Sequence, residues 1–148
     1  MLAIPTVVSA AALTDGTLSV KRGRATIGIK LGRGTVIGRL ASGQVKIKDP
    51  TPYDSSSPEV HHCRRVRYPT PNTTVCTGRK LSFRALDGRF VVTVKGTGVF
   101  LSAVGRGTGT IIGDSNPTTP NGVMSIDNAA YEQIPDFQQA FALGAPNP

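Results

Sequence analysis

The stretch L-S-F-R-A-L-D-G-R-F-V-V-T-V, residues 81–94, decides the fold class. Apolar and polar side chains alternate on both sides of Asp87-Gly88, which is the pattern of strands with one buried face. Asp-Gly is also a strong signal for a two-residue hairpin turn. We therefore expect a β-hairpin whose apolar residues pair across the strands on one core-facing side. The expected pairs are Leu81 with Val94, Phe83 with Val92, and Ala85 with Phe90.

The same period-two alternation recurs in residues 17–21, 26–31 and 44–48. Seventeen glycines and eleven prolines divide the chain into short apolar runs. This composition predicts an all-β fold, a single antiparallel β-barrel or β-sandwich of short strands. The string G-R-G-T occurs at residues 32–35 and again at residues 105–108, which is compatible with an internal duplication or with chance.

A chain of 148 residues fits one domain, which we place at residues 15–143. Residues 1–14 contain a short apolar run followed by small residues, as at the end of a signal peptide. They are interpreted as a signal-peptide remnant or a disordered N-terminus, the alternative being an apolar first strand. Residues 144–148 are a tail. No apolar run reaches about 18 residues, so no transmembrane helix is expected.

The C-terminal part of the domain carries weaker patterns. A last strand is expected around residues 123–126. Residues 129–141 are the only place where a helix could form, and Pro135 limits that helix to a turn or two.

Several strings resemble a pattern found in uncharacterised secreted β-rich proteins of high-GC bacteria. They are G-R-G-T-V-I-G-R-L at 32–40, G-R-F at 88–90, L-S-A-V-G-R-G at 101–107, Tyr131 and Ile134-Pro135. The resemblance covers about residues 15 to 143 and does not include the cysteine segment. It implies a β-rich fold and an exported location, and no chemical activity.

Cys63 and Cys76 are the only cysteines and flank a turn-like segment, residues 69–72. A disulfide between neighbouring strands is the favoured interpretation, since an exported protein would form it. Free thiols and a metal site with His61 and His62 are the alternatives. On a strand His61 and Cys63 share one face while His62 points away, so at most three ligands could converge. We expect no metal.

No catalytic residue can be assigned. The run Ser55-Ser56-Ser57, with Asp54 and His61, lacks a G-x-S-x-G elbow. A pair of Cys63 with either histidine lacks a recognisable third member. Each G-x-G triplet leads into another strand instead of a helix, so a phosphate loop is not expected and no cofactor is implied.

Charge is the strongest remaining signal. The net charge is +8, and all 17 Lys and Arg lie between Lys21 and Arg106, whereas the sequence beyond Arg106 is acidic. A hairpin at Ser42-Gly43 would place Arg39 opposite Lys46, and the hairpin at Asp87-Gly88 would place Lys80 opposite Lys95. Like charges opposite one another are unfavourable, which points to an anion above the sheet. The candidate polyanion-binding residues are Arg39, Lys46, Arg64, Arg65, Arg67, Lys80, Arg84 and Lys95.

Two alternatives to a bound anion stay open for this basic face: side chains that splay into solvent, and a cover formed by the acidic C-terminal third. The leading functional hypothesis is a non-enzymatic exported or cell-envelope protein, structural or adhesive, which binds an anionic cell-wall polymer or another polyanion non-specifically. The competing hypotheses are a nucleic-acid-binding β-barrel and an enzyme of unrecognised type. Inward-facing Phe83 and Phe90 and the lack of Trp disfavour nucleic-acid binding.

Overall fold

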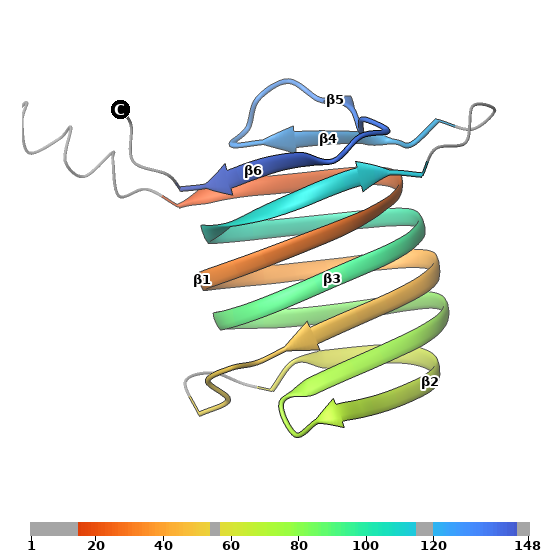
Figure 1. Ribbon diagram of the computed structural model, residues 1–148, viewed down its shortest axis with the longest axis vertical. Helices are drawn as coiled ribbons and strands as arrows, with labels where there is room; N and C mark the ends of the chain where they lie inside the picture. Colours follow the sequence, from red (N-terminus) through yellow and green to blue (C-terminus); the bar gives the residue numbers. More distant parts are fainter. Residues whose placement is uncertain (1–14, 54–56, 115–119, 145–148) are drawn as a thin grey trace, which may run out of the picture.

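The computed structural model describes residues 15–53, 57–114 and 120–144, and this part of the chain is all-β (Figure 1). The chain forms one open antiparallel sheet in the order β2-β3-β1-β4-β5, with β6 paired to β3. This confirms the predicted fold class. The elements are β1 (Gly16–Lys48), β2 (Glu59–Thr70), β3 (Thr73–Gly113), β4 (Val123–Ile126), β5 (Glu132–Gln133) and β6 (Gln139–Leu143).

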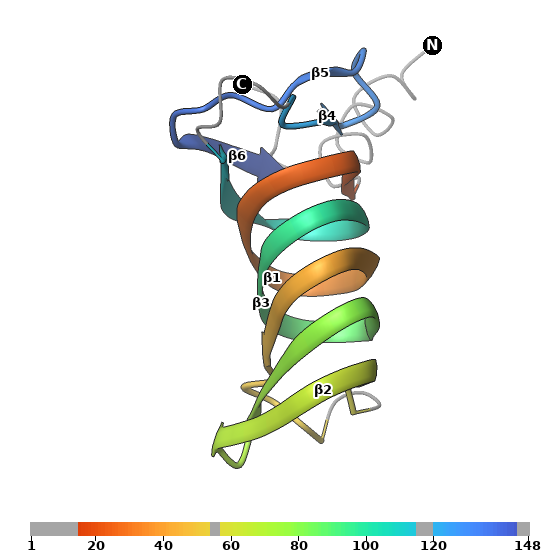
Figure 2. The same cartoon turned by 90° about the vertical axis from the view of Figure 1, so that its right-hand side faces the viewer.

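β1 and β3 form a long antiparallel ribbon that winds into a coil (Figures 1 and 2). Ile27 of β1 pairs with Val94 on one side and with Ile111 on the other, so both partners belong to β3. In the same way Val94 lies between Ile27 and Val45. A strand can have the same partner on both sides only if the ribbon returns beside itself after each turn. The short apolar segments expected from the sequence are thus successive passes of two continuous strands.

The coil is flattened into two layers, and one hydrophobic core lies between them (Figure 2). Its inward side chains stack from pass to pass along the coil. One such ladder is almost inaccessible to solvent throughout and contains Cys76, Val45, Val94, Ile27 and Ile111. The side chains expected to face the core from residues 81–94 are buried as predicted. The alternation thus assigned the buried faces correctly.

The predicted hairpin at Asp87-Gly88 is wrong. Both residues lie inside β3 at a bend of the coil, and the flanking segments pair with β1 instead of with each other. The observed pairs are Ala85 with Val36 and Phe90 with Leu31. Asp87 has a φ of 49°, and its N–H donates to Thr35 Oγ1 at 2.9 Å. Aspartate tolerates this left-handed conformation, which serves a bulged bend as well as a hairpin turn.

The hairpin expected at Ser42-Gly43 is also wrong, because these residues too lie at a bend inside a continuous strand. The expected pairs of Arg39 with Lys46 and of Lys80 with Lys95 therefore do not exist. Gly43 lies at another bend, inside β1. The partners are Ser82 and Phe100 for Arg39, Val75 and Thr93 for Lys46, and Thr26 and Gln44 for Lys95. Opposed cations therefore give no reason to expect an anion above the sheet.

The C-terminal residues finish one end of the coil (Figure 1). β4 spans residues 123–126 as predicted and pairs with the first pass of β1. Residues 129–141, the only place where a helix could form, contain β5 and part of β6 and no helix. Residues 1–14 and 145–148 lie outside the described part. Within that part, no helix has the length and apolarity needed to cross a membrane.

The two G-R-G-T strings meet in the structure, because Arg33 pairs with Arg106 across the ribbon. Their surroundings differ: Leu31, just before the first string, is buried, whereas Val104, just before the second, is 43% exposed. Internal duplication therefore stays a prediction.

The disulfide is confirmed. Cys63 of β2 is bonded to Cys76 of β3, with a Cα–Cα distance of 5.3 Å. The two strands form a hairpin in which Thr70 pairs with Thr73. Since β2 has a partner on one side only, the bond ties an edge strand to the core residue Cys76.

Removing this bond in the double variant Cys63→Ala/Cys76→Ala should lower the free energy of unfolding by about 3 kcal/mol, because the unfolded chain loses a closed loop. Chemical denaturation of the variant beside the oxidised protein measures the difference. Mass spectrometry after alkylation without reduction should find neither thiol modified in protein from its native compartment. Two modified thiols would contradict the assignment.

Candidate functional site

The first candidate surface, here called the cationic face, is the outer side of one layer of the coil. It is formed by the passes of β1 and β3 around residues 26–30, 44–48 and 91–95, together with the end of β2. Threonines such as Thr26 and Thr93 alternate with long basic side chains on these passes. The exposed cations are Lys30, Lys46, Lys48, Arg65, Arg67 and Lys95.

No carboxylate neutralises these six cations in the part of the chain that the structure describes. The ion pairs found there involve other arginines, for example Arg24 with Asp114 at 3.0 Å. Strands are about 4.8 Å apart, so Lys48 and Lys30, which lie on the two sides of Val91, are separated by about 10 Å at the backbone. The face therefore presents rows of positive charge along the long axis.

The acidic C-terminal third does not cover this face. β4 and β5 follow the first pass of the other layer, and β6 adds the last strand at the same end. Asp127 accepts a hydrogen bond from the Thr17 N–H at 2.9 Å, and Asp114 pairs with Arg24. These acids form hydrogen bonds and ion pairs at the end of the coil. The hypothesis that they cover the basic residues is therefore wrong.

The predicted polyanion-binding residues do not form one site. Four of them lie on the cationic face, two on the opposite layer, and two beside bends, one of which is Lys80 with a φ of 54°. The residues on the cationic face are Lys46, Arg65, Arg67 and Lys95. Those on the opposite layer are Arg39 and Arg84, and those beside bends are Arg64 and Lys80.

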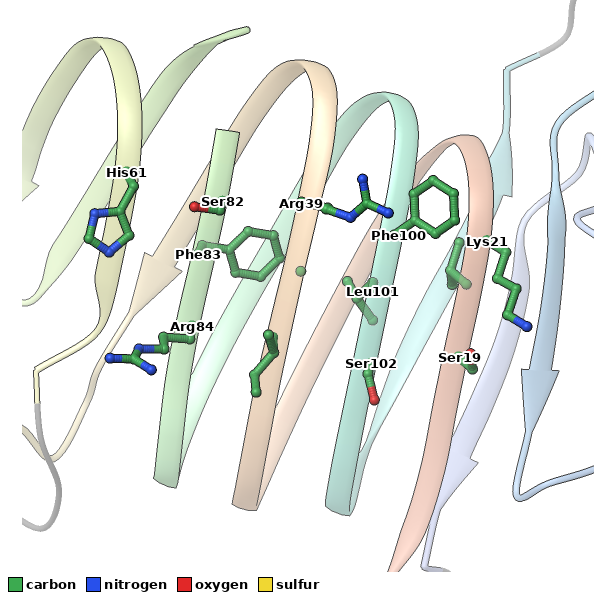
Figure 3. A pocket seen from close by; sticks show the side chains of 13 residues that line it. Ser19, Lys21, Arg39, His61, Ser82, Phe83, Arg84, Phe100, Leu101 and Ser102 are labelled. Atoms are coloured by element: carbon green, nitrogen blue, oxygen red, sulfur yellow. The ribbon is translucent and has the colours of Figure 1, made fainter. Parts of the chain in front are cut away.

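The second candidate surface is a groove of about 560 Å³ on the outside of the opposite layer (Figure 3). It crosses β1, β3 and β2 where they run side by side, so its length follows the axis of the coil. In strand order, its outward residues are Ser19 and Lys21, Phe100 and Ser102, Ile37 and Arg39, Ser82 and Arg84, and His61.

Two cations in the groove region are held against aromatic rings. The Arg39 Cζ lies 4.3 Å from the centroid of the Phe100 ring, and the Lys21 Nζ lies 4.5 Å from that of Tyr131. The Tyr131 hydroxyl is 2.7 Å from Ser19 Oγ. This hydrogen bond, with help from Lys21, lowers the pKa of Tyr131. Cation–π contacts of this kind restrict the long basic side chains to a few rotamers.

Arg84 is paired differently. Its Nε donates to Glu59 Oε2 on β2. The hydrogen bond and the charge of Arg84 hold the pKa of Glu59 below its ordinary value. Arg84 is thus partly neutralised, which leaves Arg39 and Lys21 as the principal positive charges of the groove.

Gly38 makes room for a core side chain beneath the groove. The Phe83 ring lies beneath it, and a Cβ added to Gly38 would be 2.6 Å from Phe83 Cζ. Phe83 itself is buried, so Gly38 is where the core comes closest to the groove surface. The outer surface of the groove is partly apolar, because Ile37 and Phe100 are among the residues that line it.

Sequence reasoning missed Phe100 and Tyr131. A signal for Phe100 was present, since it stands in the middle of the apolar run Val99-Phe100-Leu101. In a strand, two of these side chains share one face and the middle one must point to the other. Val99 and Leu101 are buried, and Phe100 points outward beneath Arg39.

No family model, curated protein or solved structure matches this chain. The function therefore has to be inferred from the residues of the two surfaces. Within the described ranges, no group of three or more His, Cys, Asp or Glu side chains could hold a metal ion. The two surfaces present positive charges, hydroxyl groups and a few apolar side chains, which are groups that bind a ligand.

Proposed function

We propose that this protein is a non-enzymatic exported or cell-envelope β protein, structural or adhesive, that binds anionic polymers through its cationic face. The observation that carries the proposal is the set of six exposed cations with no carboxylate paired to them in the described residues. A solvated face on a basic protein would ordinarily mix both signs of charge.

The expected mode of binding is electrostatic. A linear polyanion along the axis would meet a cation on several successive passes and release its condensed counterions. Lysines predominate, and they attract oxyanions as point charges without the fixed fork of arginine. Binding should therefore depend on charge density and be indifferent to the sequence of the polymer.

Two features support an exported location. The Cys63–Cys76 disulfide is of a kind that persists in oxidising compartments. The resemblance to secreted β-rich proteins points the same way. A wall or matrix polymer outside the cell would then be the natural polyanion.

Charge reversal on the cationic face tests the proposal. Lys46→Glu/Lys95→Glu should weaken heparin, DNA and an anionic wall polymer alike, by about tenfold or more at low salt, and should flatten the dependence of affinity on salt. Fluorescence anisotropy across a salt series measures both effects. The matched control is Arg79→Glu/Arg89→Glu, which makes the same change in net charge beside two bends of the coil.

An equal loss of affinity in the control would show that net charge, and not this face, attracts the polymer. Tight binding of a single polyanion at about 0.5 M salt would overturn the non-specific mode, since screening at that concentration is strong. Absence of binding at low salt would overturn the proposal itself.

A further inference from the structure

We propose that the groove of the opposite layer binds a polysaccharide chain bearing carboxylates, a polyuronate, laid along the axis of the coil. This site is separate from the cationic face and does not depend on the non-specific binding proposed above. Three properties of the groove point to this class of ligand: fixed cations, hydroxyl groups and an exposed apolar side chain.

The cations of the groove are suited to carboxylates. Arg39 is stacked on Phe100, so its planar guanidinium is already ordered and can present paired N–H donors to a carboxylate. Lys21, stacked on Tyr131, lies beyond Phe100 in the same row of outward side chains. The backbones of Lys21 and Arg39 are two strand spacings apart, or about 10 Å along the axis. An extended glycan advances by about one strand spacing per sugar, so its carboxylates recur on the length scale that separates these two residues.

Hydroxyl groups and the exposed Ile37 side chain suit the rest of a sugar ring. Ser82 and Ser102 line the groove on either side of the pass that contains Gly38 (Figure 3). They can donate to and accept from sugar hydroxyls, and the His61 imidazole can do the same at the far end. Between them Ile37 is 49% exposed, which gives an apolar surface to the C–H groups of a pyranose ring.

A single-stranded nucleic acid fits the groove less well. Such ligands are held by stacking successive bases on open aromatic faces. Here Arg39 lies over Phe100 and Lys21 lies over Tyr131, so a cation already occupies one face of each ring. The rings order the cations instead of offering a platform for bases.

The test compares three six-unit probes by isothermal titration at about 0.15 M salt, where weak surface electrostatics are screened. They are an oligogalacturonate, a neutral cello-oligosaccharide and oligothymidylate. We expect only the uronate to bind measurably. Lys21→Gln/Arg39→Gln should weaken the uronate by about tenfold or more, because both charge-assisted contacts are lost. The matched control Lys46→Gln/Lys95→Gln removes the same charge from the cationic face and should change the affinity by less than about threefold.

Phe100→Leu gives a second, charge-neutral variant. It removes the ring beneath Arg39 while leaving the guanidinium, so uronate affinity should fall by about threefold to tenfold. When the protein is titrated with the oligogalacturonate, the NMR chemical shifts of backbone amides should change most at Gly38, Ser82 and Ser102. Largest shifts at Gly28, on the other layer, would place the ligand on the cationic face and overturn the proposal.

Equal losses in the groove and control variants would mean that bulk charge binds the uronate, and oligothymidylate binding as tightly would show that no polysaccharide is selected. Either result, or no uronate binding, overturns the groove proposal. None of them affects the cationic-face test at low salt, so the two proposals can fail separately.

Discussion

Phe90→Ala is expected to lower the free energy of unfolding by about 3–5 kcal/mol, because it removes a large buried side chain and leaves a cavity. The Phe90 side chain is fully buried and belongs to the core cluster between the two layers. Its backbone pairs with Leu31, which is also buried. Urea denaturation, compared with the parent protein, measures the loss.

The matched control is Arg89→Ala, one position earlier in β3. Arg89 is exposed, so its truncation should change the free energy of unfolding by less than about 0.5 kcal/mol. Similar losses for the two variants would show that the alternation of β3 after the bend is displaced by one residue.

Gly43→Ala should lower the free energy of unfolding by a similar amount. Gly43 has a φ of 142°, and a Cβ there would lie 2.1 Å from the backbone oxygen of Lys95. Backbone strain of about 1–3 kcal/mol adds to overpacking of about 1–3 kcal/mol, so we expect a loss of about 2–6 kcal/mol. Thermal or chemical unfolding provides the measurement.

Gly28→Ala is the natural comparison, since a Cβ at Gly28 would meet only Thr110 Oγ1, at 3.6 Å. Both changes add one methyl group to a glycine of β1, and Gly28 has no left-handed φ. Gly28→Ala should therefore be close to neutral or stabilising. A tolerated Gly43→Ala would show that the passes of the ribbon do not approach closely at this bend.

The sequence was informative about faces and misleading about partners. Alternation identified Phe83 and Val92 as core residues because burial follows the two-residue period of a strand, whatever the strand pairs with. Asp87-Gly88 signalled a left-handed backbone, and that conformation is shared by hairpin turns and by bulged bends. Which of the two forms depends on the strand that contains Thr35, 52 residues away from Asp87, and no local pattern records it.

The candidate surfaces depend on the same long-range pairing. Cations at polar positions of strands were correctly expected to point outward, as Lys46 and Arg39 do. They were assigned to one face because each predicted hairpin was treated as a flat sheet. In the coil, the segments before and after each bend belong to opposite layers, so Lys46 and Arg39 face opposite directions. The stacking of Arg39 on Phe100 likewise joins residues that are neighbours only after the ribbon has wound.

The double pairing of β1 also sets an order for folding. Lys48 pairs with Thr73 across the shortest loop between β1 and β3, whereas Gly16 pairs with Gly105 across almost the whole domain. Because closing a short loop costs less entropy, pairing of β1 with β3 should start at Lys48 and Thr73 and extend from there. The large sequence separation of the other pairs makes folding slow. The N-terminal half has no partner of its own until β3 has been synthesised. The last residues of β1 can pair as soon as residues 73–77 have been made, whereas Gly16, at its start, has to wait for Gly105.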